Sequence, residues 1–494
     1  MLLQVRPALF AVARNEALSL ANHKEILGDP PSPWIVSVLT RAGDDALGFF
    51  ASAEPAVATW KEAYAIELAG RTWMNIGFFF RLMDRFGMPR TLVLDSIGGK
   101  AESAGDTKWF PVQLLRAMPG VLRLQWTSLQ AIMGVHHGFR ELDRRLASAK
   151  RIEALFEVNV ALMAFALRTN FAINGALAVL IRVRKKIGIP GAAEIITRKM
   201  MEEYEALRST DSGRSIEQNL DSWLGRYGHR GPLESDPANP RFAEMRDVLL
   251  MDLSSRLSGE VPAMPTASRP QALWRPLFWL DERREWFRDS LMRRWRIVRS
   301  KLLEEAGRLA REGKLESDMD IFYLQAQDLN DIMAFRDTVR RNRVAWEASS
   351  ALSMPLSSTR SEIQALLLDR RATAPGVISH ERMFPGIALS AETVEGRVVK
   401  AHTLMELLAR SNADPTLLSA ETILVVPCLE PSWAIVFPRV GGVAADIGGE
   451  LSHAAILLRE ARRPAVVNCS GLFAAVQEGS SIRLNGILQC VELL

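Results

Sequence analysis

The sequence predicts a multidomain protein in which a long, mostly α-helical region is followed by a compact α/β domain. A chain of 494 residues is too long for one hydrophobic core and is typical of two or three domains. From about residue 111 to residue 348, apolar residues recur at three- and four-residue spacing, which is typical of amphipathic helices. After residue 394, short apolar strands alternate with helical stretches, and this alternation predicts an α/β domain.

The composition is that of a soluble globular protein. The net charge of +4 is a mild basic excess in so long a chain, and it does not indicate a nucleic-acid partner. Only three cysteines occur, Cys428, Cys469 and Cys490, which is typical of reduced thiols in a cytoplasm. Their spacing fits no metal site, so we expect a cytoplasmic protein with no metal centre of its own.

The helical region contains one strongly apolar stretch, from residue 154 to residue 183. Because Glu157 and Arg168 interrupt it, we expect a buried helix pair broken near Asn174-Gly175 and no membrane span. Further along, a second amphipathic series predicts a long helix through Phe287, Leu291, Trp295, Val298 and Leu302. We expect its arginines to form a solvated face that binds no nucleic acid, namely Arg293, Arg294, Arg296 and Arg299.

A polar loop interrupts this helical pattern between Gly228 and Asp236 and continues to Pro240-Arg241. Its glycines and prolines break the helical spacing, and loops that gather charged side chains on a rigid scaffold are common places for chemistry. A buried ion-pair network that pins the loop is the structural alternative. The candidate site residues here are His229, Arg230, Glu234, Asp236 and Arg241.

The last domain follows a segment of small residues, proline and glycine at 371–376, which is typical of a hinge. Strands are predicted at 394–399, 423–426, 434–437, 465–467, 482–484 and 488–493. Between them, Gly448-Gly449 lead into Ser452-His453 and a helical stretch that stops before Pro464.

The turn before this helix carries the most informative histidine of the chain. Ser452 is a good N-cap, which places His453 at the first helical position. Free N–H groups and the helix dipole favour an anion there, and Gly448 and Gly449 let the backbone approach a bulky group. A half-buried histidine on a capped helix is the structural alternative.

The wider pattern resembles a known family. The apolar run at 423–427, Pro431-Ser432-Trp433, Phe437-Pro438-Arg439, the glycine–Ser–His turn and the run at 464–467 together resemble the mobile phosphohistidine domain of the phosphoenolpyruvate-utilising enzymes. The resemblance implies a swivelling domain in which His453 takes a phosphoryl group from ATP, with Mg²⁺, and passes it on. The loop from Gly228 to Asp236 is similar to one in the rifampicin phosphotransferase group. That likeness implies an acceptor-binding helical domain, in which Arg230 holds a phosphoryl oxygen and His229 or Glu234 accepts a proton.

The first residues resemble the closing strand of an ATP-grasp domain, which implies that Gln4 and Arg6 reach a nucleotide. We therefore expect a split enzyme whose ATP-grasp domain is a separate subunit that binds most of the ATP and Mg²⁺. The expected domains are a strand remnant at 1–7, a helical acceptor-binding domain at 8–372, a hinge at 373–380 and the swivelling domain at 381–494.

These observations lead to one expected function and two alternatives. The expected function is a dikinase-like phosphotransferase with AMP and phosphate as products. Its acceptor is a small organic molecule other than pyruvate, with a preference for an aromatic or apolar one because aromatic residues are frequent around Phe78. One alternative is a ligase subunit that condenses a phosphorylated intermediate with an amine. The other is a phosphocarrier subunit without catalytic activity.

Overall fold

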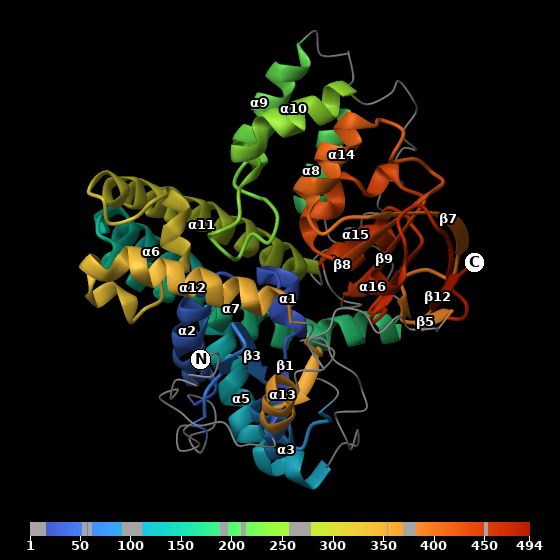
Figure 1. Ribbon diagram of the computed structural model, residues 1–494. Coiled ribbons are helices and arrows are strands. Elements are labelled where there is room, and N and C mark those ends of the chain that lie inside the picture. The colour runs from blue at the N-terminus through green and yellow to red at the C-terminus, as the bar shows by residue number, and fades with distance from the viewer. Residues whose placement is uncertain are drawn as a thin grey trace. The chain divides into compact units, whose positions relative to one another are not determined.

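The computed structural model (Figure 1) describes residues 16–51, 57, 62–90, 111–187, 196–208, 214–255, 278–352, 354–368, 382–448 and 453–494. These residues belong to two compact units. The first unit comprises residues 1–189, 235–238 and 293–375, and the second comprises residues 190–234, 239–292 and 376–494. The domain boundaries given above stay a prediction, and the hinge at 373–380 lies outside the described residues.

The first unit is mainly helical, and the described part of residues 111–348 contains no strand, as the spacing predicts. Its small antiparallel sheet has the order β2-β3-β1-β4 and consists of Ala65–Leu68, Arg71–Asn75, Ala17–Ser19 and Ser357–Thr359. Its helices are α1 (Ala21–Leu27), α2 (Pro33–Ala51), α3 (Ile76–Phe86), α5 (Pro111–Met133), α6 (Val135–Ser148), α7 (Ile152–Ile187), α12 (Phe335–Ser350) and α13 (Arg360–Leu368).

The expected break near Asn174-Gly175 is wrong, because α7 runs without interruption from Ile152 to Ile187. Both residues are exposed, so the small helical cost of Gly175 is not aggravated by packing. By length and composition, one described helical stretch, Ile152–Leu177, could cross a membrane. Half of it is buried within the protein, as in the core helices of soluble proteins, so this is weak evidence for a span.

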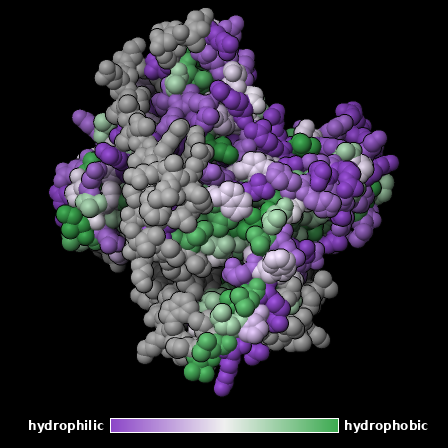
Figure 2. Space-filling model, turned by 180° about the vertical axis from the view of Figure 1, so that it is seen from behind, coloured by the Kyte–Doolittle hydropathy of each residue, from purple (hydrophilic) through white to green (hydrophobic). Residues whose placement is uncertain are grey.

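The aromatic and methionine residues that were candidates for lining an apolar pocket lie in the core of the first unit. Trp73, Met74, Phe78, Phe79 and Phe80 are all buried. By contrast, one face of α5 exposes large apolar side chains at helical spacing, namely Val112, Leu115, Met118, Leu122, Trp126, Leu129 and Met133. Figure 2 shows one side of the molecule, where apolar side chains gather in patches among polar ones. Apolar surface of this extent is typical of regions that contact another molecule.

Helix α11 (Trp279–Arg311) confirms the long helix predicted from the second amphipathic series, and all five apolar residues of that series are buried. The solvated arginine face is only partly correct. Arg293 and Arg296 are exposed, whereas Arg299 is buried and donates hydrogen bonds to the carbonyl oxygens of Pro237 (2.6 Å) and Ala238 (3.1 Å). A guanidinium can satisfy two carbonyls at once, which explains how this charge is tolerated inside.

The second unit contains an eight-stranded sheet with the order β5-β12-β11-β7-β8-β9-β10-β6, labelled in part in Figure 1. The central strands β7, β8, β9 and β10 are parallel, and the remaining pairs are antiparallel. The strands are β5 (Met383–Pro385), β6 (Ile387–Ala388), β7 (Thr393–Lys400), β8 (Thr422–Cys428), β9 (Gly442–Ile447), β10 (Ala465–Val467), β11 (Ser481–Asn485) and β12 (Cys490–Leu493). With α14 (Leu404–Ala413), α15 (His453–Glu460) and α16 (Leu472–Ala475), they confirm an α/β region near the C-terminus.

One predicted strand of this region is wrong. Residues 434–437 lie in two short 3-10 helices, η9 (Pro431–Ile435) and η10 (Phe437–Arg439). Pro431 and Pro438 lie in their first turns, where proline is favourable because its fixed φ suits a helix and its missing N–H is not needed. The sequence shows an apolar run, but the prolines decide its conformation.

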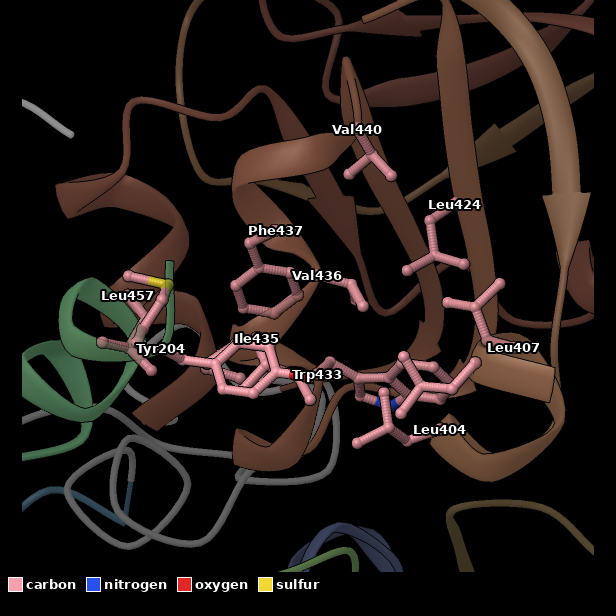
Figure 3. Packing of buried hydrophobic residues seen from close by; sticks show 14 of the residues in the cluster. Tyr204, Leu404, Leu407, Leu424, Trp433, Ile435, Val436, Phe437, Val440 and Leu457 are labelled. Atoms are coloured by element: carbon pink, nitrogen blue, oxygen red, sulfur yellow. The ribbon is translucent and has the colours of Figure 1, made fainter. Parts of the chain in front are cut away.

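Three further helices of the second unit share one hydrophobic core with the α/β region. They are α8 (Ile196–Ala206), α9 (Ile216–Tyr227) and α10 (Arg246–Ser255). In the close view of Figure 3, Tyr204 from α8 lies among Ile435, Phe437 and Leu457 of the α/β region. A buried ion pair between Arg439 and Asp252 adds a polar tie between η10 and α10.

Candidate functional site

The turn before α15 is fixed at both ends by regular structure. Strand β9 ends at Ile447, and α15 begins at His453, as the capping pattern predicts. A Cβ atom at Gly448 would lie 3.0 Å from Cβ and 3.2 Å from Cγ1 of Val467, so this position favours glycine. Gly449, Ser452 and the side chain of His453 lie outside the described residues.

A backbone hydrogen bond connects this turn to the segment after β8. The N–H of Leu429 donates to the carbonyl oxygen of Ile447 at 2.9 Å, immediately before Gly448. The next residue, Glu430, is buried, and its carboxylate accepts hydrogen bonds from the N–H of Leu233 (2.5 Å) and the hydroxyl of Ser432 (2.8 Å). The end of β9 and the polar loop are therefore joined through two consecutive residues, Leu429 and Glu430.

The polar loop carries a histidine that is held by a carboxylate. His229 is buried, and its Nε2 lies 2.7 Å from Oδ1 of Asp289 on α11. A carboxylate in this position orients an imidazole and stabilises its protonated form. Such a pair is chemically able to accept a proton from a hydroxyl group.

The next loop residue belongs to a buried network of three charges. Arg230 donates two hydrogen bonds to Glu234, from Nε at 2.6 Å and from Nη2 at 2.9 Å. Arg288 on α11 also donates to Glu234, from Nε at 3.1 Å and from Nη2 at 2.9 Å. Burial opposes the charge on Glu234, but the two guanidinium groups outweigh it and lower its pKa well below the usual range.

The remaining candidate residues have different surroundings. Asp236 belongs to the first unit, where it accepts hydrogen bonds from the N–H and the hydroxyl of Ser32, both at 2.8 Å. Arg241 is fully buried in the second unit, and its backbone N–H donates to Glu244. Gln4 and Arg6 lie outside the described residues. Within the described ranges, no group of three potential ligands could hold a metal ion.

Three residues of this arrangement, Glu430, Arg288 and Asp289, are absent from the sequence-based candidates. Glu430 had a usable signal, because it is the only acidic residue between the apolar run at 423–427 and Arg439. Arg288 had none, because it is one of many arginines on a long helix. Together with His229, Arg230 and Glu234, these residues form a cluster of complementary charge that is buried except for the partly exposed Arg288.

Comparisons with known proteins agree with this geometry. Residues 418–488 match the mobile domain of the PEP-utilising enzymes, and residues 175–309 match the fourth domain of rifampicin phosphotransferase. Over these two stretches the chain is similar to the PEP-utilising enzymes and to rifampicin phosphotransferase. The first match contains His453, and the second contains the loop with His229, Arg230 and Glu234.

Individual relatives support the same family. The rifampicin phosphotransferase of Streptomyces sviceus is 27% identical over 325 residues, which cover 59% of this chain and 36% of the relative. That of Bacillus subtilis is 25% identical over 324 residues, covering 58% and 36%. The prodigiosin synthesizing transferase of Serratia marcescens is 24% identical over 349 residues, covering 65% and 38%. The chain thus spans less than two-fifths of the length of these relatives.

Proposed function

We propose that this chain is a phosphotransferase that carries a phosphoryl group on His453 from ATP to a small organic acceptor, with AMP and phosphate as the other products. The observation that carries the proposal is the match of residues 418–488 to the mobile domain, together with the start of α15 at His453. At a helix start, free N–H groups favour the added negative charge. A neutral imidazole nitrogen attacks the β-phosphorus of ATP while the bond from that phosphorus to AMP breaks, and water then removes the terminal phosphoryl group as phosphate. The N–P bond that remains stays reactive toward oxygen.

The donor side of this proposal requires ATP and Mg²⁺, bound mainly by a separate ATP-grasp subunit that Gln4 and Arg6 help to complete. Phosphoryl transfer proceeds through a loose transition state, so positioning and positive charge contribute most of the rate. A domain on a hinge can bring one histidine to two sites in turn and keep water from the intermediate. The hinge at 373–380 has the composition for this role.

The acceptor side is proposed at the polar loop of the second unit. His229, oriented by Asp289, takes the proton of the attacking hydroxyl while the N–P bond breaks and an O–P bond forms. Arg230 and Arg288 supply positive charge, although both already contact Glu234. The effect of Arg230 persists at short range because it is buried and poorly screened, whereas Arg288 is partly exposed.

A second candidate function is a condensation in which an amine captures the phosphorylated intermediate. The Serratia marcescens relative, which has the longest alignment of the three quoted above, is named a synthesizing transferase. This name favours the condensation as a second candidate. The two candidates differ in their products, because condensation releases the transferred group as phosphate and phosphotransfer retains it in the acceptor.

Nucleotide analysis tests the proposal. The chain, an ATP-grasp subunit, Mg²⁺ and radiolabelled ATP are incubated with extracts of small molecules, and AMP formation is measured. We expect AMP together with a labelled acceptor, and neither product with His453→Ala. The matched control is His402→Ala, since His402 lies in the same region against Phe473 with ring centroids 4.6 Å apart. ADP as the sole nucleotide product would contradict the proposal.

A further inference from the structure

The segment that joins the polar loop to the phosphohistidine turn contains a buried carboxyl that no catalytic step above uses. Glu430 lies between β8 and η9, and only 5% of its surface is exposed. One carboxylate oxygen accepts from the N–H of Leu233, and the other accepts from the hydroxyl of Ser432. Buried carboxyl groups are rare unless they are paired, so the burial of Glu430 needs a physical explanation.

The partner of Glu430 in the loop has an unusual backbone. Leu233 has a φ of +44°, in the left-handed region that bulky residues seldom adopt. Such conformations persist only when the surroundings hold them, and they cluster at functional sites. The hydrogen bond from Leu233 to Glu430 is one contact that holds this conformation, and Leu233 directly precedes Glu234. The conformation of the loop therefore depends on a residue from the α/β region.

The other end of the connection reaches the phosphohistidine turn. Leu429, the neighbour of Glu430, donates its backbone N–H to Ile447, and it also packs close to Gly448. Glu430 and its neighbour Leu429 thus contact both the loop and the start of the turn. The hydrophobic core, which includes Leu429, and the Arg439–Asp252 ion pair also tie the helices of this unit to the α/β region, but Leu233 belongs to neither.

We propose that Glu430 is a positioning residue that sets the loop of Arg230 and Glu234 against the end of β9, the strand that leads toward His453. The part of this inference that concerns the turn rests on the proposed function. The hydrogen bond between Leu233 and Glu430 does not depend on that function. The charged groups that face Glu430 among the described residues are Glu234 from the loop and Arg288 from α11.

Ionisation opposes this arrangement for physical reasons. Burial raises the pKa of Glu430 to about 7, and the nearby carboxylate of Glu234 adds to the rise, while the hydrogen bonds and Arg288 reduce it. We call the state in which the N–H of Leu233 donates to Glu430 the joined state. Because the pKa of Glu430 is raised in this state, the state becomes less stable as pH rises through 7. The equilibrium constant for forming the joined state should therefore fall about tenfold between pH 6 and pH 8.

Amide hydrogen exchange of the full-length chain tests the hold on the loop. Exchange of peptides covering residues 229–236 is measured from pH 6 to pH 8 and corrected for the intrinsic pH dependence. We expect protection in the natural protein to fall about tenfold over this range, and protection in Glu430→Gln to stay constant within twofold. The amide oxygen of Gln can accept from Leu233, and its NH₂ can donate to Ser432.

Two further variants separate positioning from general packing. Glu430→Ala should lower protection of residues 229–236 at least tenfold at pH 6, whereas Ser432→Ala, which leaves the bond to Leu233, should change it less than threefold. Unchanged protection in Glu430→Ala, or the same pH response in Glu430→Gln as in the natural protein, would overturn the inference. If Glu430→Ala does not fold, the pH comparison with Glu430→Gln decides alone.

A second readout tests the connection to the turn. The chain is phosphorylated chemically with phosphoramidate, which transfers its phosphoryl group to imidazole and releases ammonia, and the modified site is located by mass spectrometry. Phosphorylation at His453 should change exchange of residues 229–236 at least threefold, and this response should vanish in Glu430→Ala. An absent response in the natural protein would contradict the connection. A His453 that cannot be phosphorylated contradicts the proposed function, and the exchange measurements then judge Glu430 by themselves.

Discussion

The guanidinium of Arg439 donates to the carboxylate of Asp252 at 2.7 Å, and this ion pair connects the α/β region to α10 inside the second unit. Tyr204 donates a further hydrogen bond to the same carboxylate at 3.0 Å. The pair lies beside a core that is apolar throughout, so its removal should be costly. These contacts tie helices from the stretch that matches the rifampicin phosphotransferase fourth domain to the stretch that matches the mobile domain.

Asp252→Ala should lower the free energy of unfolding by about 3–5 kcal/mol, because it leaves the charge of Arg439 buried. The exposed pair of Arg246 with Asp221 gives a matched control on α10 and α9, and Asp221→Ala should have little effect because solvent screens this pair. Urea denaturation of the full chain measures both values. Equal effects of the two substitutions would show that the Arg439 pair is not a structural tie.

Glu430→Gln should remove a pH dependence of stability. The pKa of Glu430 rises from 4.5 to about 7 on folding, so its contribution is fully present below pH 4.5 and is lost as pH rises through 7. The natural protein should lose about 3 kcal/mol of unfolding free energy from this group between pH 4.5 and pH 8. The variant should therefore be more stable than the natural protein at pH 8 and similar to it at pH 4.5. A variant that is less stable at both pH values would count against this assignment.

Glu234→Gln should destabilise the chain by about 3 kcal/mol or more at pH 7, because it leaves the buried Arg230 without its anion and removes the partner of the partly exposed Arg288. Since the pKa of Glu234 is lowered on folding, its contribution is present above the unfolded value and is lost only as pH falls through the folded one. Acid denaturation of the natural protein should include this loss, and the variant should lack it. Identical acid profiles would exclude a charged Glu234 in the folded state.

Gly175→Ala should raise the unfolding free energy by about 0.4–1 kcal/mol, because α7 is continuous through this exposed position and has open space beside it. Gly138→Ala, on α6, provides the contrasting control. A Cβ there would lie 2.4 Å from the ring of Phe165, so this substitution should destabilise the protein. Thermal denaturation of both variants checks the signs, and a destabilised Gly175→Ala would indicate a real break in the helix.

The sequence was informative wherever a local pattern determines structure. Apolar spacing predicts α11, the run at 465–467 predicts β10, and the capping pattern predicts that α15 starts at His453. Errors arose where one local signal outweighed another. Prolines turn the apolar run at 434–437 into 3-10 helices, and Gly175 is tolerated within a long helix.

The candidate site could be predicted only in part, because its contacts join distant parts of the chain. Leu233 and Glu430 are 197 residues apart, and Glu234 and Arg288 are 54 apart, so no periodicity or spacing reveals either contact. The loop residues themselves were visible because glycine and proline set them off from the helices. The buried partners of these residues emerged only from the fold.

The most direct test of the account is mass spectrometry of the chain after incubation with ATP, Mg²⁺ and an ATP-grasp subunit, under neutral conditions that preserve phosphohistidine. We expect an acid-labile phosphoryl group on His453 in the natural protein and in the His402→Ala variant, and none at position 453 in the His453→Ala variant. A phosphoryl group on another residue, or an unmodified His453 in a system that turns over, would contradict phosphoryl transfer through His453.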